Sequence, residues 1–86
     1  MQSKNPHLND ELIEEMKLIL LFPLDSLASG IKIHHDAAVT TRHAAIRLFD
    51  KGFITQEDGG YLTELGRELA EFSQNAVTLL TSERCL

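Results

Sequence analysis

Residues 45–69 read Ala-Ile-Arg-Leu-Phe-Asp-Lys-Gly-Phe-Ile-Thr-Gln-Glu-Asp-Gly-Gly-Tyr-Leu-Thr-Glu-Leu-Gly-Arg-Glu-Leu. The apolar periodicity of the first part predicts a helix that ends at Gly52. A short strand over residues 53–56 and an Asp-Gly-Gly turn then predict a tight hairpin. Thr63 is a good N-cap for a second helix. The stretch therefore predicts the order helix, hairpin, helix.

The flanking sequence extends this order. Asn9 or Asp10 can cap a first helix that Pro23 ends. A short helix or turn is expected over residues 24–29, and residues 31–33 alternate as a strand does. We expect Asp36 to cap a helix over residues 37–51. Helix, strand, helix, hairpin and helix is the order of a winged helix-turn-helix domain, so the predicted fold is mainly α with a small β-hairpin: about four helices and a two- or three-stranded wing.

Length and composition set limits on function. The 86 residues are enough for one domain, which we place at residues 9–80, between a disordered tail (1–8) and a frayed C-terminus (81–86). A single cysteine, a polar start and the lack of a long apolar run indicate a cytoplasmic protein without a signal peptide or membrane span. The net charge of −5 is unusual for a nucleic-acid binder.

The charge is uneven, and the segment from Lys32 to Lys51 is net basic and contains the 37–51 helix. One arc of that helix carries small, hydrogen-bonding and cationic residues, as a recognition helix in the major groove requires. We therefore expect a small DNA-binding transcriptional regulator, with double-stranded DNA as its partner. The candidate contacts are Lys32, Thr40, Thr41, His43, Ala44, Arg47, Lys51 and Arg67.

The wing favours a different function. Its tip reads Gln56-Glu57-Asp58-Gly59-Gly60 and would repel phosphate. The alternative is a protein-interaction or dimerisation module that uses the fold without binding nucleic acid. A positive strip through Lys32, Arg47 and Lys51 would favour DNA, and its interruption by Glu57, Asp58 or Asp36 would favour protein.

Two further kinds of site are not expected. Neighbouring histidines in an extended segment point in opposite directions, so His34, His35 and Asp36 are a poor metal site, and their role stays open. The chain lacks the Gly-x-Ser-x-Gly and phosphate-loop motifs of enzymes. We therefore expect neither catalysis nor a cofactor.

Apolar residues that fall outside the expected core faces predict a homodimer. On a helical wheel the first helix has an apolar face at residues 12, 13, 16, 19 and 20, and other large apolar residues lie off it. The last helix carries a stripe at residues 65, 69, 72, 76 and 79, with further apolar residues beside it. Either the other helices of the chain or a partner subunit could bury these surplus apolar residues. We expect a partner subunit to bury them. The predicted interface is Leu18, Leu21, Phe22, Val77 and Leu80.

Two resemblances support the fold. Residues 62–69 resemble the Leu-Thr-x-x-Gly-Arg stretch that follows the wing in regulators of the multiple-antibiotic-resistance-repressor type. Residues 8–81 resemble a family of small uncharacterised gammaproteobacterial proteins, through Gly-Ile-Lys-Ile-His-His-Asp at 30–36 and Asp-Gly-Gly-Tyr-Leu-Thr at 58–63. The second resemblance implies a single winged-helix-like domain and assigns no activity.

Overall fold

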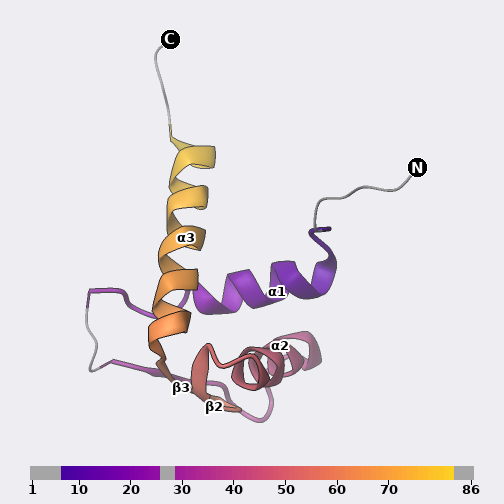
Figure 1. Ribbon diagram of the computed structural model, residues 1–86. Coiled ribbons are helices and arrows are strands. Elements are labelled where there is room, and N and C mark those ends of the chain that lie inside the picture. Colours follow the sequence, from indigo (N-terminus) through magenta and orange to yellow (C-terminus); the bar gives the residue numbers. More distant parts are fainter. Residues whose placement is uncertain (1–6, 26–28, 83–86) are drawn as a thin grey trace.

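The computed structural model describes residues 7–25 and 29–82, and it is mainly helical with one small sheet (Figure 1). The element order is α1 (Asp10–Ile19), β1 (Ile31–Lys32), α2 (Val39–Asp50), β2 (Ile54–Gln56), β3 (Gly59–Leu62) and α3 (Glu64–Thr81). This confirms the expected class of helices plus a small sheet. The described residues form three helices, fewer than the four or so expected.

The sheet is antiparallel, with strand order β1-β3-β2. The hairpin is formed, but its turn residues are Glu57 and Asp58, and Gly59 and Gly60 of the predicted Asp-Gly-Gly turn begin β3 with φ angles of 122° and 77°, which are strained for other residues. β1 joins the hairpin through the pairs Ile31–Gly60 and Lys32–Gly59. The predicted strand at residues 31–33 is therefore formed, in a three-stranded sheet.

Helix α3 begins with two devices encoded in the Leu-Thr-x-x-Gly sequence. The Thr63 hydroxyl accepts from the Gly66 amide at 3.0 Å and donates to the Gly52 carbonyl at 2.6 Å. It thereby caps α3 and ties it to the end of α2. Gly66 packs so closely against the Phe53 carbonyl that a methyl group in its place would overlap that carbonyl. Thr63 and Gly66 thus have structural roles.

The core lies where α1, α2, the hairpin and the first half of α3 meet. Its buried apolar residues are Leu18, Ile19, Phe22, Ala44, Ala45, Leu48, Ile54 and Ala70. Leu18 and Phe22 are only 3% exposed within this single chain, so their assignment to a dimer interface was wrong. The other helices of the chain cover them. Leu21, at 65% exposure, does point outward.

Helix boundaries differ from the expected ones in the middle of the chain. Helix α1 ends at Ile19, before Pro23 is reached. Helix α2 begins at Val39 behind Ala38, without a side-chain cap, so Asp36 does not cap it. The helix or turn expected over residues 24–29 falls partly outside the described residues. Between β1 and β2 the described residues form one helix, α2.

Helix α3 is the longest element, and its C-terminal half extends beyond the rest of the fold (Figure 1). Its buried residues, Gly66, Ala70 and Ser73, all lie in the first ten positions. From residue 74 onward every described side chain is exposed except Ala76, which is half-buried. The second half of this helix is therefore largely uncovered within the described chain.

Candidate interaction surfaces

A buried carboxylate joins α1 to α2. Glu15 is 5% exposed, and it accepts hydrogen bonds from Arg47 Nε and, at 2.7 Å, from Lys51 Nζ. A second guanidinium nitrogen of Arg47 donates to the Glu11 carbonyl at 3.0 Å. We call Glu15, Arg47 and Lys51 the α1–α2 ion triad. Two of the four cations expected to contact DNA, Arg47 and Lys51, are therefore directed at α1.

Electrostatics holds the triad ionised. Burial raises the pKa of the Glu15 carboxyl, but the hydrogen bonds and positive charges of Lys51 and Arg47 outweigh this effect. The net pKa of Glu15 lies below its ordinary value. The carboxylate therefore keeps its charge at neutral pH and balances much of the positive charge on α2.

The rest of the expected recognition arc divides between core and surface. Ala44 is fully buried against the core, so its assignment as a DNA contact was wrong. Thr41 is half-buried, and Thr40 and His43 are exposed. Thr40, His43 and Arg47 line a hollow of about 140 Å³ with three acidic residues of α1: Asp10, Glu11 and Glu14. These carboxylates disfavour an approaching phosphate.

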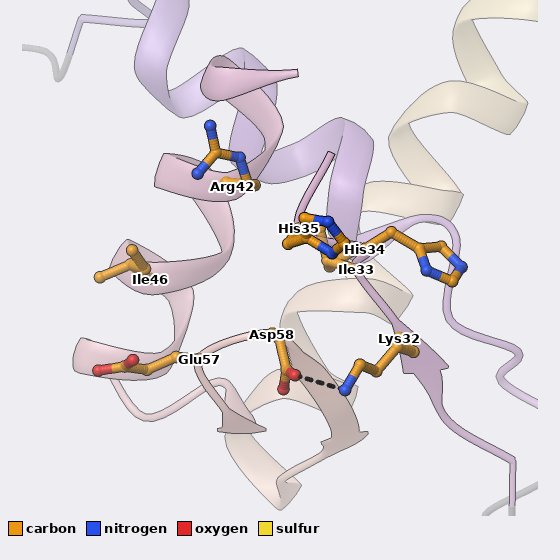
Figure 2. A pocket seen from close by; sticks show the side chains of 8 residues that line it. All are labelled: Lys32, Ile33, His34, His35, Arg42, Ile46, Glu57 and Asp58. Carbon is orange, nitrogen blue, oxygen red and sulfur yellow. Dashed lines mark ion pairs between the residues drawn. The ribbon is translucent and has the colours of Figure 1, made fainter. Parts of the chain in front are cut away.

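A second hollow, of about 330 Å³, lies between α2, the segment after β1 and the hairpin tip (Figure 2). It is lined by Lys32, Ile33, His34, His35, Arg42, Ile46, Glu57 and Asp58. Lys32 Nζ forms an ion pair with Asp58 at 2.9 Å, and this hydrogen bond lowers the pKa of the Asp58 carboxyl. Arg42 Nε donates to the Ala37 carbonyl at 3.1 Å. The hairpin tip therefore neutralises Lys32, the third expected phosphate contact.

The paired histidines of this hollow diverge. His35 points toward the space between Arg42 and Asp58, and His34 points away from it (Figure 2). In the described part of the chain, no three histidine, cysteine or acidic side chains are grouped so that they could hold a metal ion. The geometry gives His34, His35 and Asp36 no common ligand.

Positive charge is consequently scarce on the described surface. Each described lysine forms an ion pair with a carboxylate: Lys17 with Glu14, Lys32 with Asp58 and Lys51 with Glu15. Arg67 shares a shallow groove with Leu65 and the acidic residues of α3, Glu64, Glu68 and Glu71. Its buried Nη1 atom has no hydrogen-bond partner in the described structure. Ion pairs therefore reduce the positive charge that the described lysines offer to a nucleic-acid backbone.

The most prominent apolar surface is on α3. We define the α3 face as Leu65, Leu69, Phe72, Ala76 and Leu79, with Leu80 beside it. Phe72, Leu79 and Leu80 are 65%, 64% and 84% exposed. Of the other two predicted interface residues on the surface, Val77 is exposed next to this face and Leu21 lies on the turn after α1. Large apolar side chains so exposed and so close together mark an interaction surface.

Glu15 was missed by sequence reasoning, although a signal for it was present. Glu15, Leu18, Ile19 and Phe22 are spaced as i, i+3, i+4 and i+7, which is one face of a helix. A carboxylate at the head of an apolar stripe must be buried with a cation, because an unpaired buried charge is very unfavourable. The two cations of α2 are the partners that this rule requires.

Comparison with known proteins gives one match. No curated protein and no solved structure matches the chain. No helix of the described residues is long and apolar enough to cross a membrane. A family model described as a family of unknown function (DUF5669) matches residues 6–81, which is most of the chain. The chain therefore belongs to the DUF5669 family.

Proposed function

We propose that this chain is a protein-interaction module that binds through the α3 face. The observation that carries the proposal is the exposure of Phe72, Leu79 and Leu80 on a helix that extends beyond the fold. Burying each such side chain contributes about 1.5–3 kcal/mol. A partner that covers several of them would therefore gain much of the binding free energy of a specific complex. Residues 72–82 contain no charged side chain, so no charge in this stretch opposes its burial by a partner.

Electrostatics supports protein over nucleic acid as the partner. Glu15 pairs with both Arg47 and Lys51 and offsets one of their two charges, and Asp58 pairs with Lys32. Asp58 is one of the acidic residues expected to interrupt the positive strip, and Glu15 is an acid beside Arg47 and Lys51 that the sequence did not predict; both pairings support the interaction module over a DNA-binding protein. The order β1–α2–β2–β3–α3 supports a winged-helix-like arrangement in which the hairpin is the wing, a fold that serves both kinds of function.

A charge placed on the α3 face tests this function. Phe72→Glu should abolish association measured by sedimentation and binding of a dye such as ANS, which reports exposed apolar surface. Gln74→Glu is the matched control, because Gln74 is exposed on the opposite side of α3 and the same charge is added. Far-ultraviolet circular dichroism checks that both variants fold. If the wild-type protein neither associates nor binds the dye, the α3 face is not an interaction surface.

Duplex DNA binding is the second candidate, and one observation favours it. Thr40 and His43 are exposed near the N-terminus of α2, where a recognition helix contacts base edges. Titration of a duplex at two salt concentrations tests it. Because the lysines are already paired, any binding should show a shallow dependence on salt. A steep dependence would mean that phosphate displaces Glu15 and Asp58, and absence of binding at low salt would remove this candidate.

A further inference from the structure

We propose that the hollow between α2 and the hairpin tip binds a short peptide of two or three residues, with free amino and carboxyl ends and an apolar side chain. This site is separate from the α3 face and does not depend on the proposed function. The observations behind it are the unpaired charges that line the hollow, their order along it, and its size.

Two charged groups of the hollow have no partner of opposite sign. Lys32 and Asp58 satisfy each other in an ion pair at 2.9 Å. Arg42 donates through Nε to the Ala37 carbonyl, and within the described residues its two terminal nitrogens have no acceptor. The exposed Glu57 carboxylate likewise has no cationic partner in that part of the chain. A ligand that carries one carboxylate and one ammonium group matches this pair of free charges.

The order of these groups favours a peptide over a free amino acid. Arg42, Ile46 and Glu57 follow one another along one side of the hollow (Figure 2). Arg42 and Ile46 alone are one turn of α2 apart, about 6 Å along the helix axis. Both charged groups of an α-amino acid are attached to one carbon and lie closer together than this. An extended peptide advances about 3.3–3.6 Å per residue, so two or three residues reach from Arg42 to the Glu57 end.

The rest of the lining fits the body of such a peptide. Ile46 is 39% exposed between the two free charges, and Ile33 is half-buried, so both offer apolar contact to a ligand side chain. His35 points into the hollow between Arg42 and Asp58 (Figure 2), and its ring can hydrogen-bond a peptide group. The volume of about 330 Å³ is at the lower end of the range of about 300–1,000 Å³ for ligand sites. The hollow therefore has room for only a few residues.

The charge balance of the hollow selects against polyanions. Lys32 and Arg42 are opposed by Glu57 and Asp58, so the lining has no net charge apart from its histidines. Such a lining does not attract phosphate strongly, whereas a ligand with one charge of each sign can satisfy both free groups. The expected ligand is therefore a neutral zwitterion.

Titration of the ¹⁵N-labelled full chain with leucyl-leucine, followed by amide chemical shifts, tests the site. We expect saturable shifts around residues 33–35, 42–46 and 57–58. N-acetylation or C-terminal amidation of the peptide should each weaken binding about three- to tenfold, between the effects of losing an exposed ion pair and a hydrogen bond to a charged group. Free leucine should bind more weakly than the dipeptide.

Variants of the two free charges assign each end of the peptide. In Glu57→Gln, N-acetylation should cause no further loss of affinity, and in Arg42→Gln, amidation should cause none. Arg42→Lys keeps the charge but lacks the guanidinium fork, so it should fold and lose only part of the affinity. His35→Gln should weaken binding. His34→Gln is the matched control and should bind as the wild type does, because His34 points away from the hollow (Figure 2).

Two outcomes would overturn the proposal. One is the absence of saturable shifts at about 10 mM leucyl-leucine, where a site with a millimolar dissociation constant is nearly full. The other is an affinity that neither cap on the peptide changes. Phe72→Glu should leave peptide binding unchanged, so failure of this site and failure of the α3 face are distinguished.

Discussion

The carboxylate of Glu15 has two cationic partners and little contact with water. The attraction within such a buried group roughly offsets the desolvation of its charges, but removing one member leaves the others uncompensated. Arg47 and Lys51 remain partly exposed, with side chains 26% and 43% accessible, so water can solvate them in part. Glu15 therefore matters mainly because its absence would leave two cations unpaired beside a core.

The first prediction is that Glu15→Gln lowers the free energy of unfolding by about 1–3 kcal/mol, the range for losing hydrogen bonds to charged groups. Urea denaturation measures the change. Glu14→Gln is the matched control, because Glu14 forms only a surface ion pair with Lys17 at 3.7 Å and such pairs contribute little. Equal effects of the two substitutions would mean that the triad does not hold α1 to α2.

The pH dependence of stability follows from the same group. Because the pKa of Glu15 is lowered on folding, the unfolded chain binds its proton at a higher pH than the folded chain does. This contribution is complete above the unfolded pKa of about 4.3 and is lost as pH falls through the folded pKa. Glu15→Gln should therefore flatten the decline in stability below about pH 4.3, and an unchanged acid profile would contradict the assignment.

At the scale of elements, the start of α3 depends on one glycine. In Gly66→Ala, the better helix propensity of alanine, up to about 1 kcal/mol, is opposed by overlap of the new methyl with the Phe53 carbonyl. We expect net destabilisation by about 1–3 kcal/mol, the usual effect of overpacking, as a lowered melting temperature. Gln74→Ala, at an exposed position of the same helix, should not be destabilising. A Gly66→Ala protein as stable as the wild type would show that α3 can move away from Phe53.

The order of most elements could be predicted from the sequence, because periodicity and helix caps such as Thr63 are local signals, but the cap expected at Asp36 was wrong. The sequence did not predict which side of each helix faces the core. On α2, Val39, Ile46 and Phe49 share an arc that looks like a core face, yet all three are exposed, and the buried residues include Ala44 and Ala45. On α3, the leucine stripe is largely exposed and Gly66, Ala70 and Ser73 are buried.

Close packing explains both inversions. Small residues allow neighbouring elements to approach, and the larger apolar residues then lie to one side of the contact. A helical wheel gives the angle between two faces but not which of them finds a partner within the chain. The pairing of Arg47 with Glu15 spans 32 residues, and long-range pairings of this kind leave no local signal beyond the position of the acid in its stripe.

At the scale of the whole molecule, size limits stability. A chain of this length buries only about 60% of its unfolded surface, and here the second half of the longest helix contributes little to that burial within one copy. Association through α3 would add apolar burial that the single chain cannot supply. Folding and assembly are then linked by mass action.

The melting temperature of the wild-type protein should consequently rise with protein concentration. Calorimetry at about 10 µM and about 300 µM measures the shift, because the melting temperature of an associating protein continues to rise with concentration. In Phe72→Glu the melting temperature should be independent of concentration and below that of the wild type. If the melting temperature of the wild-type protein does not change over this range, the α3 face stays exposed to solvent at all these concentrations.

The α1–α2 ion triad has a consequence for how the family can diverge. A single exchange at position 15 to a neutral residue would leave two cations on α2 without their internal counterion, next to the exposed Thr40 and His43. Positions 15, 47 and 51 are therefore expected to change together among family members that keep this surface neutral. A relative that keeps the cations at 47 and 51 but lacks the acid at 15 would have gained affinity for polyanions on an unaltered scaffold.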